Sequence, residues 1–174
     1  KAEEEGKHII HMEVGQPGTS APKLSQDTLA KMMSKNTLGY TVSLGLPELR
    51  KRISQLYGEW YNVDLDSNRV VVTTGSSGAF ILSFASLFDV GDKVGIGAPG
   101  YPSYRQILKA QDLVPVNIET HLENRFQPIP DDLSKYNLKG LLVASPANPT
   151  GSMLDRNNLS SLINKAKEKN VSFI

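Results

Sequence analysis

From Val70 onward, short apolar segments alternate with segments of helical character, and this rhythm constrains the fold more than any other feature of the chain. Strands of this length separated by helices are typical of a mostly parallel sheet covered by helices on both faces. The sequence therefore predicts a three-layer α/β fold. The predicted strands are 69–74, 93–97, 113–119, 140–145 and 171–174, and the predicted helices are 76–88, 103–111 and 157–170.

The first 68 residues are less regular. We expect a short strand at 8–14, a helix at 24–35 and a second helix that begins at Pro47, because proline is well tolerated at the first helical position. Apolar residues recur at helical spacing after Pro47, and we expect Tyr57 and Trp60 of this stripe to pack in the core.

Composition excludes several classes of protein. The formal net charge is +1, with 19 basic and 18 acidic residues, so the sequence predicts neither a nucleic acid partner nor a membrane partner. The absence of cysteine excludes disulfides, thiolate metal ligands and cysteine nucleophiles. His8 and His11 would lie on opposite faces of a strand, so no metal site is expected. The composition fits a cytoplasmic enzyme, and the charged opening and apolar close suggest an interior piece of a longer protein.

The stretch VGIGAPGYP at 94–102 contains three glycines, Gly95, Gly97 and Gly100, at the spacing of a dinucleotide-binding turn. Such a turn works because its helix begins at the glycines and directs backbone N–H groups at a pyrophosphate. Here Pro99 and Pro102 lack that N–H, and the helix is expected to begin near Pro102, beyond all three glycines. The stretch matches the pattern without the mechanism, so a nicotinamide enzyme is disfavoured.

A better anion site comes directly after the strand predicted at 69–74. Gly75 permits a tight turn, and Ser76 and Ser77 add hydroxyls to the N–H groups at the positive end of the next helix. One phosphate group fits such a cradle. Simple N-capping by a serine, which requires no ligand, explains the same residues equally well.

Two further loops come after predicted strands, at the edge of the sheet where ligands bind in folds of this kind. Asn148 lies between Pro146 and Pro149, and its amide can donate or accept a hydrogen bond to a ligand. Tyr101 offers an aromatic face in the neighbouring loop. Taken singly, Asn148 could be an ordinary turn residue and Tyr101 a packing residue.

Five blocks of sequence, in order and spacing, resemble the class I/II aminotransferases, which are pyridoxal-phosphate enzymes of fold type I. These blocks are EVGQPGTSAP, GYTVSLGLPELRKRI, TTGSSGAF, APGYPSY and ASPANPTG, and together they extend over essentially the whole chain. The resemblance implies an α/β large domain, present here incomplete, that binds pyridoxal 5'-phosphate. It implies the transfer of an amino group from an amino acid to a 2-oxo acid.

The same resemblance assigns roles to individual residues. It implies that Gly75, Ser76 and Ser77 hold the cofactor phosphate, that Tyr101 stacks on the pyridine ring, and that Asn148 hydrogen-bonds the phenolic oxygen of the ring. Two residues nearer the start have other implied roles. Tyr40 matches a tyrosine that reaches the cofactor phosphate of the partner subunit in a homodimer, and Gly15 matches a glycine whose backbone lies near the substrate carboxylate. Residues 1–20 would belong to the small domain and 21–174 to the large domain.

The chain departs from the family pattern because three functional residues of the family are expected beyond residue 174. They are the lysine that forms the Schiff base, the aspartate that pairs with the pyridinium and the arginine that binds the substrate carboxylate. The 174 residues alone are therefore expected to be inactive. Two alternatives use the same fold. One is another pyridoxal-phosphate enzyme, such as a carbon–sulfur lyase, and the other is a non-catalytic effector domain of a regulator.

Overall fold

The computed structural model describes residues 1–12, 15 and 17–174, and the chain divides into two compact units, 1–43 and 44–174. The first unit contains helix α1 (Lys23–Met33), which confirms the helix predicted at 24–35 to within two residues. The strand predicted at 8–14 is wrong over 8–12, which form no strand, and residues 13 and 14 lie outside the described residues. Described residues of this segment pair with no other extended segment, and a strand without a partner leaves its N–H and C=O groups unpaired.

The second unit is built on a parallel sheet with the strand order β2-β1-β3-β4. Its described pairings are all parallel, as the alternating pattern predicts. The predicted strand at 140–145 ends three residues early, and the last predicted strand is only two residues long. The strand bounds are β1 (Lys93–Ala98), β2 (Val114–Glu119), β3 (Gly140–Leu142) and β4 (Ser172–Phe173).

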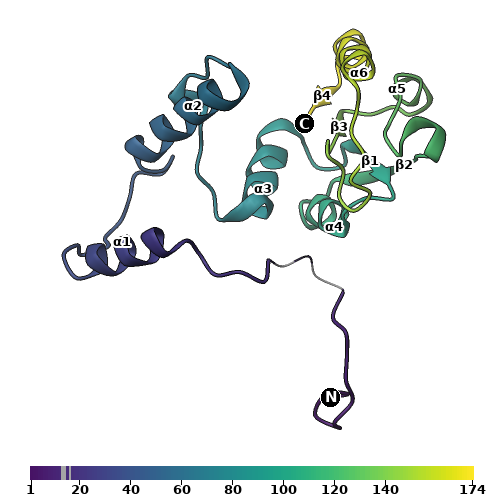
Figure 1. Ribbon diagram of the computed structural model, residues 1–174. Coiled ribbons are helices and arrows are strands. Elements are labelled where there is room, and N and C mark those ends of the chain that lie inside the picture. Colours follow the sequence, from purple (N-terminus) through teal and green to yellow (C-terminus); the bar gives the residue numbers. More distant parts are fainter. Residues whose placement is uncertain (13–14, 16) are drawn as a thin grey trace. The chain divides into compact units, whose positions relative to one another are not determined.

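Helices lie on both faces of this sheet, as Figure 1 shows. The helices of the second unit are α2 (Pro47–Tyr61), α3 (Gly75–Leu87), α4 (Pro102–Ala110), α5 (Asp132–Lys135) and α6 (Arg156–Lys169), with 3-10 turns η1 (Ser67–Arg69) and η2 (Leu122–Asn124). Pro47 and Pro102 each open a helix as predicted. The sequence pattern does not predict the short helix α5.

Two apolar clusters hold the layers together, one on each face of the sheet. Adjacent residues of β3 divide between them: Leu141 packs with residues of α5 and α6, whereas Leu142 packs with residues of α3 and α4. This alternation results from the pleat of a strand, which directs successive side chains to opposite faces. The three-layer α/β fold predicted from the sequence is confirmed.

The strand predicted at 69–74 is wrong. Ser67–Arg69 forms η1, and residues 70–74 are in no strand. Val72 N–H donates to the Leu44 carbonyl at 3.0 Å, but this single bond is not a ladder. A strand needs a neighbour that continues to pair along its length, and the described residues offer this segment none.

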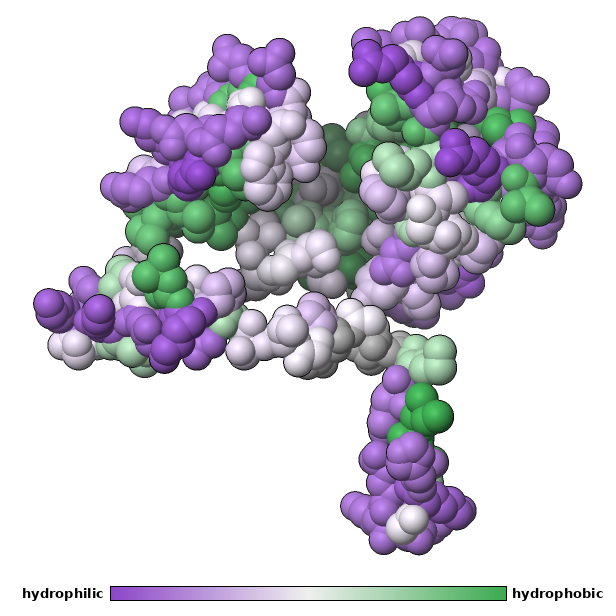
Figure 2. Space-filling model, in the orientation of Figure 1, coloured by the Kyte–Doolittle hydropathy of each residue, from purple (hydrophilic) through white to green (hydrophobic). Residues whose placement is uncertain are grey.

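The expected core packing of Tyr57 and Trp60 is also wrong for the described residues. Trp60 is 67% exposed and Tyr57 is 44% exposed. Both rings instead meet the ring of Tyr61 edge to face, with centroid distances of 6.2 Å and 5.5 Å respectively. No side chain of α2 is buried in the described chain, so hydrophobic surface remains visible along this helix (Figure 2). The predicted helical period is correct, but periodicity does not show whether a partner covers the stripe.

Candidate functional site

The carboxyl ends of β1 and β3 form the edge of the sheet at which the candidate site lies. The two strands pair in parallel, with Ile96 opposite Leu142, so the loops after them leave the sheet side by side. A small hollow lies between these loops. It is lined by Gly97, Pro99, Gly100, Tyr104, Phe126, Gln127, Pro128, Leu142, Val143, Ala144, Ala147 and Asn148. Asn148 therefore shares a hollow with the turn that leads to Tyr101.

Tyr101 borders a second hollow, on the α4 side of the same turn. That hollow is also lined by Gly97, Gly100 and Tyr104, which the two hollows have in common. Tyr101 precedes the first residue of α4, and its ring remains partly exposed. The structure thus brings Tyr101 and Asn148 to the same edge of the sheet, as their positions after two neighbouring strands predict.

Backbone geometry in these loops is distinctive. The Ala98–Pro99, Ser145–Pro146 and Asn148–Pro149 peptide bonds are cis. Gly100 approaches the preceding turn so closely that a Cβ added there would clash with the Gly97 carbonyl oxygen. Gly95, by contrast, is a buried residue of β1 whose missing side chain leaves room for leucine and isoleucine side chains. Gly95 therefore allows side chains to pack against the sheet, and it does not shape the loop.

The amino-terminal end of α3 carries the predicted phosphate cradle. The helix begins at Gly75, which has a φ of 74°, and Thr74 at the N-cap position makes no side-chain capping bond. Ser76 and Ser77 are exposed, and within the described chain their hydroxyls have no hydrogen-bond partner. The serines lie in the first turn and do not cap the helix. In the part of the chain that the structure describes, no side chain caps the N–H groups of this first turn.

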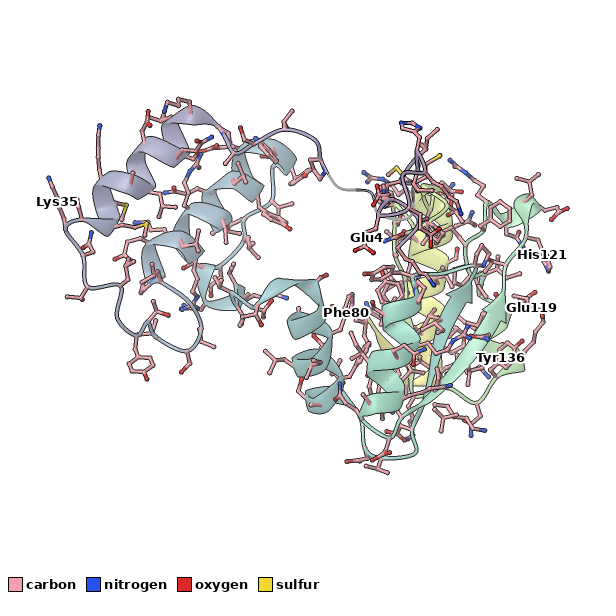
Figure 3. All side chains as sticks on the ribbon, turned by 90° about the horizontal axis from the view of Figure 1, so that it is seen from below. Glu4, Lys35, Phe80, Glu119, His121 and Tyr136 are labelled. Carbon is pink, nitrogen blue, oxygen red and sulfur yellow. The ribbon has the colours of Figure 1, made fainter. Side chains whose placement is uncertain are left out.

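Aromatic contacts connect α3 to Tyr101. Phe80, which is labelled in Figure 3, lies one turn after Ser76 and Ser77, and its ring meets that of Tyr104 edge to face at 5.0 Å. Tyr104 in turn meets Tyr101 at 5.5 Å. Burial raises the pKa of Tyr104, and the neighbouring Tyr101 adds to the rise. Tyr104 therefore stays protonated through the neutral pH range.

Two predicted site residues belong to the other unit. Gly15 and Tyr40 belong to the unit 1–43, which is described by itself. Tyr40 is fully exposed, at 110% of its reference area, and Gly15 is exposed with no atom within 4 Å of where a Cβ would be.

Sequence reasoning missed two buried polar residues beside the site. Thr120 Oγ1 donates to the Ala98 carbonyl at 2.9 Å, at the end of β1. Gln127 Nε2 donates to the Ala144 carbonyl at 3.1 Å and to the Ser152 carbonyl at 3.0 Å. Both lie in a polar segment that resembles an ordinary surface loop, and no sequence signal distinguishes them from exposed loop residues.

These features define an α/β protein with a parallel sheet and loops that converge at its carboxyl edge. A family model for aminotransferase class I and II matches residues 7–174, and the chain belongs to that family. It is 39% identical over 168 residues to valine–pyruvate aminotransferase from Mycobacterium tuberculosis, covering 95% of this chain and 43% of the relative.

Solved structures agree with this assignment. A candidate aminotransferase from Silicibacter pomeroyi is 59% identical with a TM-score of 0.89, covering 99% of this chain and 44% of that one. Aspartate aminotransferase from Thermotoga maritima is 29% identical with a TM-score of 0.92, covering 99% of this chain and 47% of that one. The chain therefore spans less than half the length of these relatives. Among the described residues, no helix is long and apolar enough to cross a membrane.

Proposed function

We propose that these residues are the amino-terminal part of a pyridoxal-phosphate-dependent aminotransferase, which transfers an amino group from an amino acid to a 2-oxo acid. The observation that carries the proposal is the shared edge of the sheet, where Asn148 and the turn leading to Tyr101 border one hollow. Membership of the aminotransferase family supports the reaction type.

The residues at this edge, together with those at the start of α3, fit a phosphorylated aromatic cofactor. The start of α3 offers a dipole, first-turn N–H groups and two hydroxyls without partners in the described chain. Open space surrounds Gly75, because a Cβ built there would meet no atom within 4 Å. We propose that Gly75, Ser76 and Ser77 hold the phosphate.

The remaining roles concern the ring. We propose that Tyr101 stacks on the pyridine and that the Asn148 amide donates to its phenolic oxygen. When bound, the cofactor supplies an electron sink for the electrons left by proton removal at the substrate Cα. The chain's own residues bind the cofactor and fix its orientation, and the lysine that links to it is expected beyond residue 174.

The proposal extends to the assembly and its substrates. We propose a homodimer in which Tyr40 reaches the partner's cofactor phosphate, and a substrate carboxylate near the Gly15 backbone. The complete exposure of Tyr40 supports a role outside its own unit. Residues 1–20 are proposed to belong to the small domain and 21–174 to the large domain, and the protein is proposed to act in the cytoplasm. Named relatives include valine–pyruvate and aspartate aminotransferases, so we propose no single donor.

The test is made on the whole protein. It is incubated with pyridoxal phosphate, reduced with borohydride, and its intact mass is measured. We expect one phosphopyridoxyl adduct, on a lysine beyond residue 174, and transfer of an amino group from an amino acid to a 2-oxo acid. Release of free ammonia instead of amino transfer would identify a lyase, and an adduct without turnover would favour the effector domain. Absence of an adduct would overturn the proposal.

The proposed role of Asn148 is tested by Asn148→Ala. Loss of one hydrogen bond to the ring is expected to weaken cofactor binding about tenfold, as judged by fluorescence titration. Asn164→Ala is the control, because Asn164 is an exposed residue of α6 away from the hollow. Equal affinities in the two variants would remove Asn148 from the ring-binding residues.

A further inference from the structure

Residues 120–132, the first part of the segment between β2 and β3, cross the carboxyl edge of the sheet, and we call them the strap. Glu119 and His121, labelled in Figure 3, show where the strap leaves β2. Among the described residues, the buried polar or charged side chains are Thr120, Gln127 and Asp132, and all three belong to the strap. A buried polar group costs free energy unless it is hydrogen-bonded, so each of them requires a structural reason.

Thr120 and Asp132 make hydrogen bonds at the two ends of the strap. The Thr120 backbone N–H and side-chain hydroxyl both donate to the Ala98 carbonyl, at 3.0 Å and 2.9 Å. Asp132 accepts from the Ile129 N–H at 2.9 Å, and its other oxygen lies 3.5 Å from Lys135 Nζ. These bonds attach the strap to the end of β1 and to the start of α5.

Gln127 makes the contact with the loop that contains Asn148. Its side chain is 3% exposed, and its amide nitrogen reaches two carbonyls, that of Ala144 just after β3 and that of Ser152. An amide NH2 has two donors, so both are used across the base of the loop. The Ser152 carbonyl also accepts from the Ala147 N–H at 2.8 Å. The Ser152 carbonyl oxygen therefore links Gln127 to Ala147, the residue before Asn148.

Among the described residues, the other hydrogen bonds of the loop do not reach the strap. The Thr150 and Ser152 hydroxyl oxygens lie 2.9 Å apart within the loop. Gly151 N–H donates to the Ala147 carbonyl at 2.7 Å, and Leu154 N–H donates to Ser145 Oγ at 3.0 Å. The first of these bonds is internal to the loop, and the second joins its two ends. Gln127 is the buried side chain that joins both ends of the loop to the strap.

We propose that Gln127 is a positioning residue, whose side-chain amide fixes the loop 144–152 and thereby the place of the Asn148 side chain. The role of Asn148 toward the ring rests on the proposed function, whereas the fixing of the loop does not. Removal of the amide would leave the Ala144 carbonyl without a donor and the Ser152 carbonyl with the Ala147 N–H alone, and it would weaken the attachment of both ends of the loop to the strap.

The first test measures hydrogen exchange in the whole protein without cofactor, comparing Gln127→Met with Thr120→Val. Methionine has a similar length and no donor, and Thr120→Val removes an equally buried hydroxyl bond at the end of β1. In Gln127→Met we expect the amides of Ala147, Gly151 and Leu154 to exchange about tenfold faster, with β1 unchanged. In Thr120→Val these three amides keep their protection.

Unchanged exchange of the loop in Gln127→Met would overturn the proposal. Equal acceleration in both variants would also overturn it, because the effect would then be a general loosening.

The second test measures the cofactor directly through the pH titration of its absorbance. If Asn148 meets the ring, Gln127→Met shifts the midpoint in the same direction as Asn148→Ala and by less. A shift in Asn148→Ala without one in Gln127→Met would overturn the positioning of Asn148 by Gln127. Absence of a shift in Asn148→Ala itself, with faster loop exchange in Gln127→Met, would count against the proposed function and leave the fixing of the loop intact.

Discussion

The rings of Tyr101 and Tyr104 meet edge to face, with centroids 5.5 Å apart and an interplanar angle of 77°. Tyr104 also contacts Phe80 of α3 in the same manner, at 5.0 Å. Edge-to-face pairs of this kind are favourable beyond the area they bury. Tyr104 is therefore the ring that connects the proposed phosphate helix to the proposed stacking residue.

The raised pKa of Tyr104 predicts that the protein loses stability at alkaline pH. Burial raises the pKa of its phenol in the folded state, with a further contribution from Tyr101. A raised pKa means that the folded state holds the proton more tightly than the unfolded state, so this stabilisation is complete below pH about 10 and is lost as the pH rises above it. We expect Tyr104→Phe to reduce the loss of stability above that pH, measured by urea unfolding. An equal loss of stability in the wild type and in Tyr104→Phe would contradict this prediction.

Substitution of Gly75 is expected to weaken binding of the cofactor phosphate specifically. Gly75 has a φ of 74°, and an alanine there costs about 1 kcal/mol because of its left-handed backbone. Gly91→Ala is a matched control, because its φ is 86° and its Cβ also meets no atom within 4 Å. Urea unfolding should show a similar loss in both variants. Cofactor affinity should fall only in Gly75→Ala, and a similar fall in Gly91→Ala would remove Gly75 from the cradle.

Arg50 predicts a local contribution to stability. Its Nε donates to the Val70 carbonyl at 2.7 Å and its Nη2 donates to the Ser67 carbonyl at 3.0 Å, so the guanidinium holds η1 against α2. A lysine cannot reproduce this fork, and Arg50→Lys is expected to cost about 1–2 kcal/mol. Arg52→Lys is the control, because Arg52 is exposed and pairs with Glu59 alone, and it should leave the unfolding midpoint nearly unchanged. Equal midpoints for the two variants would show that Arg50 contributes nothing by its geometry.

The sequence predicts the helices along the whole chain, but it predicts strands and burial well only in the second half, for a physical reason. Residues beyond Lys93 bury their apolar positions against each other, so periodicity and burial agree there. The valines at 70–72 and the stripe containing Trp60 also have clear patterns, but in the described chain no neighbour pairs with the first or covers the second. A pattern indicates what a segment can bury or pair, and a partner outside the pattern decides whether it does.

The residues of the candidate site also divide into those that the sequence locates and those that it does not. Tyr101 and Asn148 could be located from the sequence because each comes after a strand, at the edge where parallel strands end together. Gln127 could not, because no strand directly precedes it and it contacts backbone carbonyls 17 and 25 residues away. Its importance depends on tertiary contacts that local sequence does not encode.

The glycines of the stretch at 94–102 provide the last prediction, since they first suggested a dinucleotide turn. A Cβ at Gly95 would lie 2.8 Å from Leu138 Cδ1 and 3.0 Å from Ile118 Cδ1, so Gly95→Ala must displace core side chains. We expect it to destabilise the protein by about 1–3 kcal/mol in urea unfolding. At Gly97 the nearest atom would be Thr120 Cγ2 at 3.8 Å, an ordinary contact, and Gly97→Ala should cost less.

Close pyrophosphate approach at Gly97 would instead appear as an effect on ligand affinity, because in a dinucleotide turn the second glycine admits the ligand and the first shapes the turn. Isothermal titration with NAD distinguishes the two explanations in the wild-type protein, where we expect no binding. Binding of NAD that Gly97→Ala abolishes would restore the dinucleotide interpretation. If NAD does not bind and Gly95→Ala is less stable than Gly97→Ala, Gly95 is a packing residue of the sheet.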